Sequence, residues 1–208
     1  MVITYLGKQF FKITQGELTL AVNPISKDSK TSSNARFGAD VVFVSVNHAD
    51  YNGVSQMTYG EREPFVINGP GDYEVKDIFI KGVMSNASLD GKKYINTIYT
   101  LSLDGINMVF LGALSDANLS KDAMEAIESP DIIFTPIGGK DSLDAKTSAR
   151  LIASLEPKLV IPMNYDEASL RNFLKEMGEE EAEVTEKLTL KKKDLEGKEG
   201  AVLVIKAS

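Results

Sequence analysis

The chain has 208 residues, of which 43% are hydrophobic and 25% are charged, and both values are ordinary for a folded globular protein. Its 23 basic and 30 acidic side chains give a net charge of −7. This balance argues against a general nucleic-acid-binding protein, because phosphate contacts need an excess of Lys and Arg. The sequence has no cysteine and one histidine, His48, which excludes disulfides, cysteine-ligated zinc and any site built from several imidazoles.

No apolar run reaches the roughly 18–20 residues that a membrane helix requires. The first 22 residues are interrupted by Gly7, Lys8, Lys12 and Gln15, so they do not form the apolar stretch of a signal peptide. We therefore expect a cytoplasmic protein with no membrane contact and no nucleic-acid partner.

The first half of the chain is expected to consist mainly of strands. Period-two alternation of apolar residues and turn signals, such as Gln15-Gly16 and Asp104-Gly105, predict strands at residues 2–6, 10–14, 18–22, 64–68, 73–75, 78–83, 95–103 and 107–111. A polar stretch at residues 23–34 is expected to be a loop. The dense apolar run at residues 41–44 indicates a fully buried strand, and chemistry is commonly placed at the carboxyl end of such a strand.

In the second half, strands alternate with helices. Helical spacing of apolar residues and capping signals predict helices at residues 120–127, 144–155 and 167–177. Further strands are expected at residues 132–135, 159–161, 185–190 and 201–205. No linker is long enough to separate domains, so residues 1–208 are expected to form a single α/β domain.

Four segments carry a resemblance that covers nearly the whole chain. They are DVVFVSVNHADYN (residues 40–52), NGPGDYEVKDIFIKGV (68–83), NTIYTLSLDGINMVFLGALSD (96–116) and DIIFTPIGGKDSLDAKTSARLIASLEPKLVIPMNY (131–165). In order and spacing they resemble the metallo-β-lactamase fold superfamily, in particular its small bacterial and archaeal metal-dependent hydrolases related to L-ascorbate-6-phosphate lactonase. The resemblance implies an α/β protein with a four-layer αββα metallo-β-lactamase-like sandwich.

Members of this superfamily hold one or two metal ions with a His-x-His-x-Asp-His cluster, a further His, an Asp after a Leu-Gly pair, and a His after Ile-Pro-Met. Aligned with that pattern, this chain has Val46, His48, Asp50, Tyr51, Asn86, Ala113 and Asn164. Two further positions, where the resemblance implies His and Asp, hold Phe110 and Asn23. Only His48 and Asp50 of the metal ligands are retained.

These replacements weigh against a metal centre, because a catalytic zinc needs about three protein ligands and an open position for water. Valine and alanine have no lone pair, and an asparagine oxygen is a poor substitute for imidazole. The phenol of Tyr51 coordinates only as phenolate, which its ordinary pKa of about 10 opposes. We therefore expect no metal and no other cofactor.

The favoured interpretation is a pseudo-hydrolase that has lost catalysis and acts as a binding or assembly module. The alternative is a metal-dependent hydrolase of a lactone or phosphoester with an atypical, reduced metal site, and zinc enters only under this alternative. Whether the chain is an enzyme is thus left open. Nucleic-acid processing, an activity of some superfamily branches, is disfavoured by the acidic charge and the compact length.

A polar remnant of the site remains available for binding. The candidate binding residues are Lys8, Asn47, Tyr51, Asn164, Tyr165 and Asp166, next to the remnant pair His48 and Asp50. We expect the Lys8 ammonium to pair with Asp50 in place of the missing cation; the alternative is a Lys8 side chain extended into water. His48 is either a hydrogen-bonded structural residue or a general base with Asp50. The partner is an unidentified small ligand or protein, and self-association into a homo-oligomer is left open.

Overall fold

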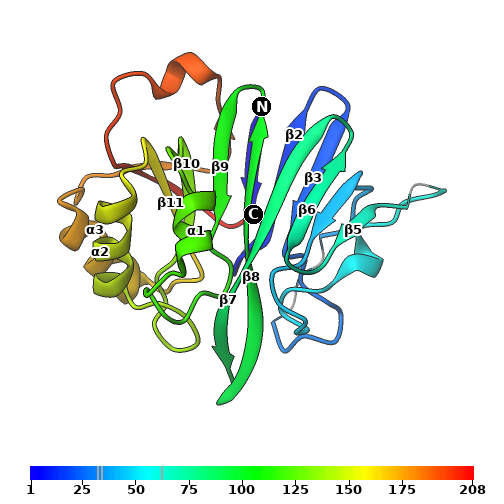
Figure 1. Cartoon of the computed structure of the whole chain (residues 1–208), viewed down its shortest axis with the longest axis horizontal. Helices are drawn as coiled ribbons and strands as arrows, with labels where there is room; N and C mark the ends of the chain where they lie inside the picture. The colour runs from blue at the N-terminus through cyan, green and yellow to red at the C-terminus, as the bar shows by residue number, and fades with distance from the viewer. Residues whose placement is uncertain (32, 34, 62) are drawn as a thin grey trace.

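Two β-sheets packed face to face form the centre of the computed structural model, which describes residues 1–31, 33, 35–61 and 63–208 (Figure 1). Within these residues the first sheet has six strands in the order β13-β1-β2-β3-β4-β5. Their bounds are β1 Val2–Tyr5, β2 Phe11–Gln15, β3 Leu18–Val22, β4 Val41–Phe43, β5 Phe65–Ile67 and β13 Leu188–Thr189. The polar stretch after β3 is a loop as predicted over its described residues; Ser32 and Asn34 lie outside them.

The second sheet has eight strands over the described residues, in the order β12-β14-β11-β10-β9-β8-β7-β6. Their bounds are β6 Gly71–Val75, β7 Ile78–Leu89, β8 Lys92–Leu103, β9 Ile106–Phe110, β10 Ile132–Pro136, β11 Leu159–Met163, β12 Glu183–Thr185 and β14 Ala201–Ile205. The strands from β6 to β9 are antiparallel, whereas β9, β10, β11, β14 and β12 are parallel. The sheet therefore begins as a meander and continues through helical crossovers.

Helices cover the outer face of the second sheet (Figure 1). They are α1 Lys121–Ala126, α2 Ala145–Leu155 and α3 Glu167–Met177. Ser120, Asp144 and Asp166 cap their N-termini by accepting backbone N–H groups, which explains why each helix begins where it does. In the described part of the chain, no helix is both long and apolar enough to cross a membrane.

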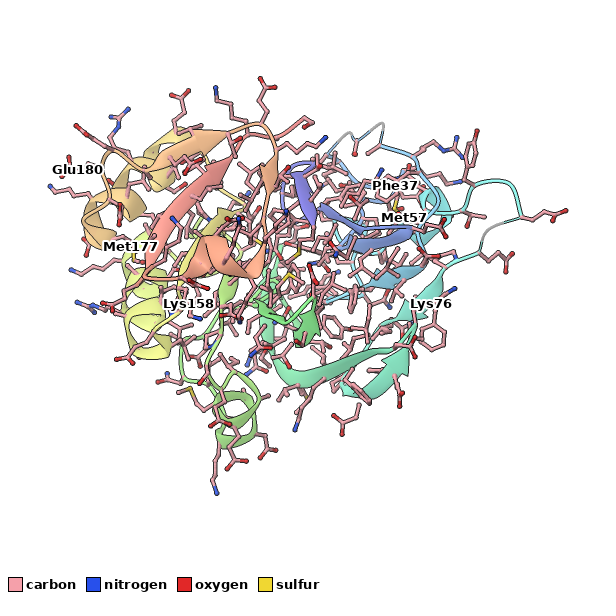
Figure 2. All side chains as sticks on the ribbon, turned by 90° about the horizontal axis from the view of Figure 1, so that it is seen from above. Phe37, Met57, Lys76, Lys158, Met177 and Glu180 are labelled. Carbon is pink, nitrogen blue, oxygen red and sulfur yellow. The ribbon has the colours of Figure 1, made fainter. Side chains whose placement is uncertain are left out.

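The outer face of the first sheet is covered by loops and by the short 3₁₀ helix η1, Val54–Gln56. Phe10, Val42 and Met57 are buried there, and Phe37 packs against them; Figure 2 shows Phe37 and Met57 together on this side. The α/β prediction is confirmed, and the layer over this face, as far as the structure describes it, consists of irregular segments that bury the same kind of apolar surface as a helix.

An aromatic group ties the two sheets together. The Phe11 ring of the first sheet meets the edge of Phe134 in the second, with ring centroids 4.8 Å apart. Phe110 stacks on Phe134 at 4.2 Å, and both rings are fully buried. Burying each of these side chains contributes about 1.5–3 kcal/mol, so the group is a main source of cohesion between the sheets.

Two predictions of strand extent are corrected. The strands β7 and β8 each have 12 residues and extend beyond the predicted ranges 78–83 and 95–103, because they form one long hairpin. The predicted strand at residues 185–190 is divided between β12 and β13, which join different sheets.

Candidate functional site

A cavity of about 480 Å³ opens where loops from both sheets meet. The loops follow β1, β3, β4, β10 and β11, and the turn between β7 and β8 completes the wall. The lining residues are Lys8, Asp28, Ser29, Lys30, Thr31, His48, Ala49, Asp50, Tyr51, Leu89, Asp90, Gly138, Lys140, Asp141, Asn164, Tyr165 and Asp166. The site therefore lies at the carboxyl end of the parallel strands β10 and β11, where α/β proteins commonly bind ligands.

The cavity brings together seven of the eight residues that the sequence predicts for the site. Lys8, His48, Asp50, Tyr51, Asn164, Tyr165 and Asp166 all line it. Asn47 does not: its side chain is exposed and accepts a hydrogen bond from Asn52 at 2.9 Å. Asn47 thus lies outside the lining of this cavity, unlike its neighbour His48, and its role in binding stays a prediction.

The Lys8 ammonium and the Asp50 carboxylate form an ion pair at the cavity wall. The ammonium donates to Oδ2 of Asp50, and the Ser29 hydroxyl donates to Oδ1, so both carboxylate oxygens are engaged. The predicted pairing of Lys8 with Asp50 is thereby confirmed. Ser29 was not predicted, because it lies in a polar loop that contains no motif pointing toward the site.

The charge of Asp50 is stabilised by these contacts. Burial by itself would raise the pKa of the Asp50 carboxyl, but the hydrogen bonds from Lys8 and Ser29 and the positive charge of Lys8 lower it by more. The pKa therefore lies below its ordinary value, and the carboxyl is ionised at neutral pH.

The backbone of Lys8 is held by two hydrogen bonds. Its φ of 50° lies in the left-handed region, which side chains other than glycine seldom adopt. The carbonyl oxygen of Lys8 accepts hydrogen bonds from the Tyr5 hydroxyl and from the Asn164 N–H, each at 2.7 Å. Asn164 is itself left-handed, with a φ of 53°. Such strained positions persist where surrounding contacts hold them, and here they place Lys8 and Asn164 side by side in the cavity.

His48 is held by its own turn. Its Nδ1 accepts the backbone N–H of Asp50 at 3.2 Å, and Nε2 lies 3.9 Å from a carboxylate oxygen of Asp90. The ring meets the edge of Tyr94 with centroids 5.7 Å apart. An acceptor at Nδ1 requires the neutral ring to carry its proton on Nε2. His48 is thus a hydrogen-bonded residue whose Nε2 side is available to the cavity.

Residues at positions where the resemblance implies metal ligands pack in a mainly apolar cluster. Val46, Tyr51 and Ala113 are buried at 1%, 2% and 0% exposure, and Ala87 and Leu89 complete the cluster. Burial raises the pKa of the Tyr51 phenol, and the negative charges of Asp50 and Asp141 raise it further, so phenolate is not available as a ligand.

The residues present do not fit a catalytic zinc. The two donors that match the family pattern already make hydrogen bonds within the protein. Asp50 accepts from Lys8 and Ser29, and Nδ1 of His48 accepts the backbone N–H of Asp50. In the parts of the chain that the structure describes, no group of three or more His, Asp or Glu side chains is arranged to hold a metal ion. Zinc needs about three such donors, and valine and alanine supply none.

The other two positions that the resemblance marks have structural roles. Phe110 is part of the aromatic group between the sheets. The buried Asn23 accepts the Ser45 N–H through Oδ1 at 2.8 Å. The close approach of two segments requires glycine at position 138, after β10, because a Cβ there would lie 2.1 Å from the carbonyl oxygen of Asn164. The additional wall residues, such as Lys30, Asp90 and Lys140, were not predicted because they lie in loops without sequence motifs.

Comparison with known proteins agrees with this architecture. A metallo-β-lactamase superfamily protein of Thermotoga maritima has a TM-score of 0.75 and 26% identity, covering 98% of this chain and 97% of its own. The metallo hydrolase Igni18 of Ignicoccus hospitalis, with a TM-score of 0.65 and 18% identity, covers 100% of this chain and 95% of its own and shares the fold.

Sequence comparison finds relatives named UPF0173 metal-dependent hydrolases. That of Thermococcus onnurineus is 26% identical over an alignment of 192 positions, which covers 79% of this chain and 84% of the relative. That of Alkaliphilus metalliredigens is 24% identical over an alignment of 199 positions, which covers 80% of this chain and 86% of the relative. The family profile described as "Beta-lactamase superfamily domain" matches residues 2–164. With this match over most of its length, the chain belongs to the β-lactamase superfamily, within the metallo-β-lactamase fold.

Proposed function

We propose that this chain is a non-catalytic member of its superfamily that binds a small polar ligand in the cavity without a metal ion. The observation that carries the proposal is the internal neutralisation of Asp50. Its carboxylate is paired with the Lys8 ammonium, while Val46, Tyr51 and Ala113 fill the other ligand positions with buried apolar packing. A cavity with this wall lacks the means to activate a water molecule through zinc, yet it keeps a volume that suits a small molecule.

The lining indicates what kind of ligand fits. Three lysines and five aspartates give 3 − 5 = −2 with His48 neutral, so a highly charged anion is disfavoured. Since the Lys8 and Asp50 charges cancel, the remaining aspartates accept hydrogen bonds and Lys30 and Lys140 donate them. A small molecule with several hydroxyl, amide or ammonium groups matches this mixture of acceptors and donors.

The second candidate function is hydrolysis at an atypical, reduced metal site. It is favoured by the relatives, which are named metal-dependent hydrolases, and by the presence of His48 and Asp50 on one wall. The names of these relatives favour a metal ion, which would have to displace Lys8 from Asp50. The single-domain organisation, the cytoplasmic location, the absence of a nucleic-acid partner and the oligomeric state stay predictions.

Metal analysis combined with an activity assay separates the two functions. The protein is purified without chelator, its zinc, manganese and iron contents are measured, and lactone and phosphoester substrates are assayed with added metal and with EDTA. We expect less than stoichiometric metal and no turnover above background, with His48→Ala equal to the parent protein. Stoichiometric metal together with turnover that both EDTA and His48→Ala abolish would establish the hydrolase instead.

Binding is tested separately by ligand-observed NMR with a library of small polar molecules. Compounds that bind the parent protein and lose affinity when Asp141→Asn or Lys140→Met alters the cavity wall would support the proposal. Binding that neither substitution changes would place the ligand elsewhere on the molecule.

A further inference from the structure

We infer that Gln9, Asn23 and Ser45 enclose an internal site that binds ordered water, at the base of the loops that form the cavity wall. These three residues are not part of the lining of the cavity. The inference goes beyond the proposed function, since it depends neither on the ligand of the cavity nor on a metal ion.

The three side chains are buried with polar atoms left over. Gln9, Asn23 and Ser45 are 0%, 1% and 2% exposed. Among the residues that the structure describes, Oε1 and Nε2 of Gln9, Nδ2 of Asn23 and Oγ of Ser45 find no hydrogen-bond partner. Burying such atoms unpaired is costly, and native proteins pair nearly all of them, either with protein groups or with ordered water. The four atoms therefore indicate a small occupant that forms hydrogen bonds.

Strand pairing brings the three residues to the same end of the first sheet. Gln9 lies two positions before Phe11 of β2. Phe11 pairs with Val22 of β3, and Asn23 directly follows Val22. Ser45 lies two positions after the end of β4, which runs parallel to β3. Asn23 and Ser45 are in direct contact, because the Ser45 N–H donates to Oδ1 of Asn23 at 2.8 Å.

The available donors and acceptors suit a neutral water molecule. Since Oδ1 of Asn23 accepts the Ser45 N–H, its Nδ2 is a donor that requires an acceptor. The Gln9 amide offers both a donor and an acceptor, and the Ser45 hydroxyl acts as either. An ion is disfavoured, because these side chains bring no charge that would offset its burial. Buried water typically makes about three hydrogen bonds to polar groups of this kind.

A buried amide beside the site has no such need. A Cβ on Gly112 would lie 2.4 Å from Oδ1 of Asn96 and 2.9 Å from the Ser45 hydroxyl, so Asn96 and Ser45 are close together. The Asn96 amide makes hydrogen bonds to protein groups at 2.7, 2.9 and 2.9 Å. Protein groups thus satisfy one buried amide in this region fully, and the atoms left over at Gln9, Asn23 and Ser45 mark a distinct site.

Water at this site would link three segments that build the cavity wall. Gln9 directly follows Lys8 in the chain. Ser45 comes three positions before His48, and the loop after Asn23 supplies another part of the wall. A water molecule bound by all three side chains would therefore connect the segments at the point where they leave the first sheet.

The test is a count of long-lived internal water by ¹⁷O magnetic relaxation dispersion. The variant is Gln9→Met/Ser45→Ala, which removes both polar atoms of Gln9 at similar side-chain length and also removes the hydroxyl. A buried water needs about two to four polar partners, and the variant leaves Nδ2 of Asn23 alone. We expect the variant to hold fewer long-lived water molecules than the parent protein, by about one or more.

Ser148→Ala is the matched control. Ser148 is also a fully buried serine, but its hydroxyl is already paired with that of Thr135 at 2.6 Å. Its removal should leave the count of internal water at the parent value. A crystal structure of the parent protein locates the site, and we expect water within hydrogen-bond distance of Gln9, Asn23 and Ser45.

Two results would overturn the inference. One is an equal count in the parent protein and the folded double variant, or an equal loss in Ser148→Ala. The other is a crystal structure in which the polar atoms of Gln9, Asn23 and Ser45 bond to protein groups instead of water. If circular dichroism shows that the double variant does not fold, Ser45→Ala and the crystal structure decide. Either result leaves the proposed ligand binding untouched, because that function is tested at the cavity wall.

Discussion

The buried carboxylate of Asp131 connects three parts of the second sheet. Its side chain is 3% exposed and accepts from Lys158 at 2.8 Å and from Lys192 at 2.5 Å. It also accepts the backbone N–H of Asn107 at 2.8 Å. These contacts join the starts of β9 and β10, the residue before β11 and the 3₁₀ helix η2, Lys192–Leu195. We expect Asp131→Asn to destabilise the fold because it removes the charge that all three donors share.

The size of the expected loss of stability follows from how exposed the side chains are that bind Asp131. Hydrogen bonds to a charged group are worth about 1.5–3 kcal/mol each, but Lys158 and Lys192 are 42% and 47% exposed and regain water when the charge is lost. Most of the loss therefore falls on the buried acceptor, and we expect the free energy of unfolding to fall by about 2–4 kcal/mol. Urea unfolding at pH 7, followed by circular dichroism, measures this difference.

The pH dependence provides a second measurement. Burial by itself would raise the pKa of Asp131, but the hydrogen bonds from Lys158, Lys192 and Asn107 lower it below its ordinary value. Its contribution is therefore complete above the unfolded-state pKa of about 4 and is lost as the pH falls through the lower folded-state pKa. The gap between parent protein and Asp131→Asn should narrow below about pH 4. A difference under about 0.5 kcal/mol at pH 7, or a gap that widens in acid, would refute the reasoning.

Two further substitutions test the packing that shapes the site. Gly138→Ala places a Cβ 2.1 Å from the carbonyl oxygen of Asn164, so we expect the free energy of unfolding, measured by thermal unfolding, to fall by about 1–3 kcal/mol. Gly69→Ala is the control, because the space around Gly69 is open, and its stability should stay near that of the parent protein. Equal losses in the two variants would contradict the steric explanation. Phe110→Ala removes a fully buried ring that stacks on Phe134 with centroids 4.2 Å apart. We expect the free energy of unfolding, measured in urea, to fall by about 3–5 kcal/mol. A fall of less than about 1 kcal/mol would show that this ring does not hold the sheets together.

Much of the secondary structure could be predicted from local patterns. The strands β3 and β14 and the helix α3 have the predicted bounds, because alternating or helical apolar spacing and the caps are encoded within each segment. The long hairpin of β7 and β8 was underestimated, since its outer half is polar and becomes a strand only through pairing along the whole ribbon. The division of residues 183–189 between two sheets depends on which edge strand each part meets, and no local pattern contains that information.

From the sequence by itself we predicted a shortage of metal donors at the positions that the resemblance marks, because the identity of a side chain fixes whether it has a lone pair to offer. The sequence also indicated that Lys8, His48, Asp50 and Asn164 would meet, through the order of the strands that precede them. Only the tertiary structure decided that the Ser29 hydroxyl donates the second hydrogen bond to the Asp50 carboxylate and that Asn47 lies outside the cavity lining. Lys8 and Asp50 are 42 positions apart, and their contact depends on a left-handed backbone at Lys8 held by Tyr5 and Asn164. Contacts of that kind arise from packing between distant segments, where the energy of the whole fold selects a backbone conformation that the local residues would not adopt alone.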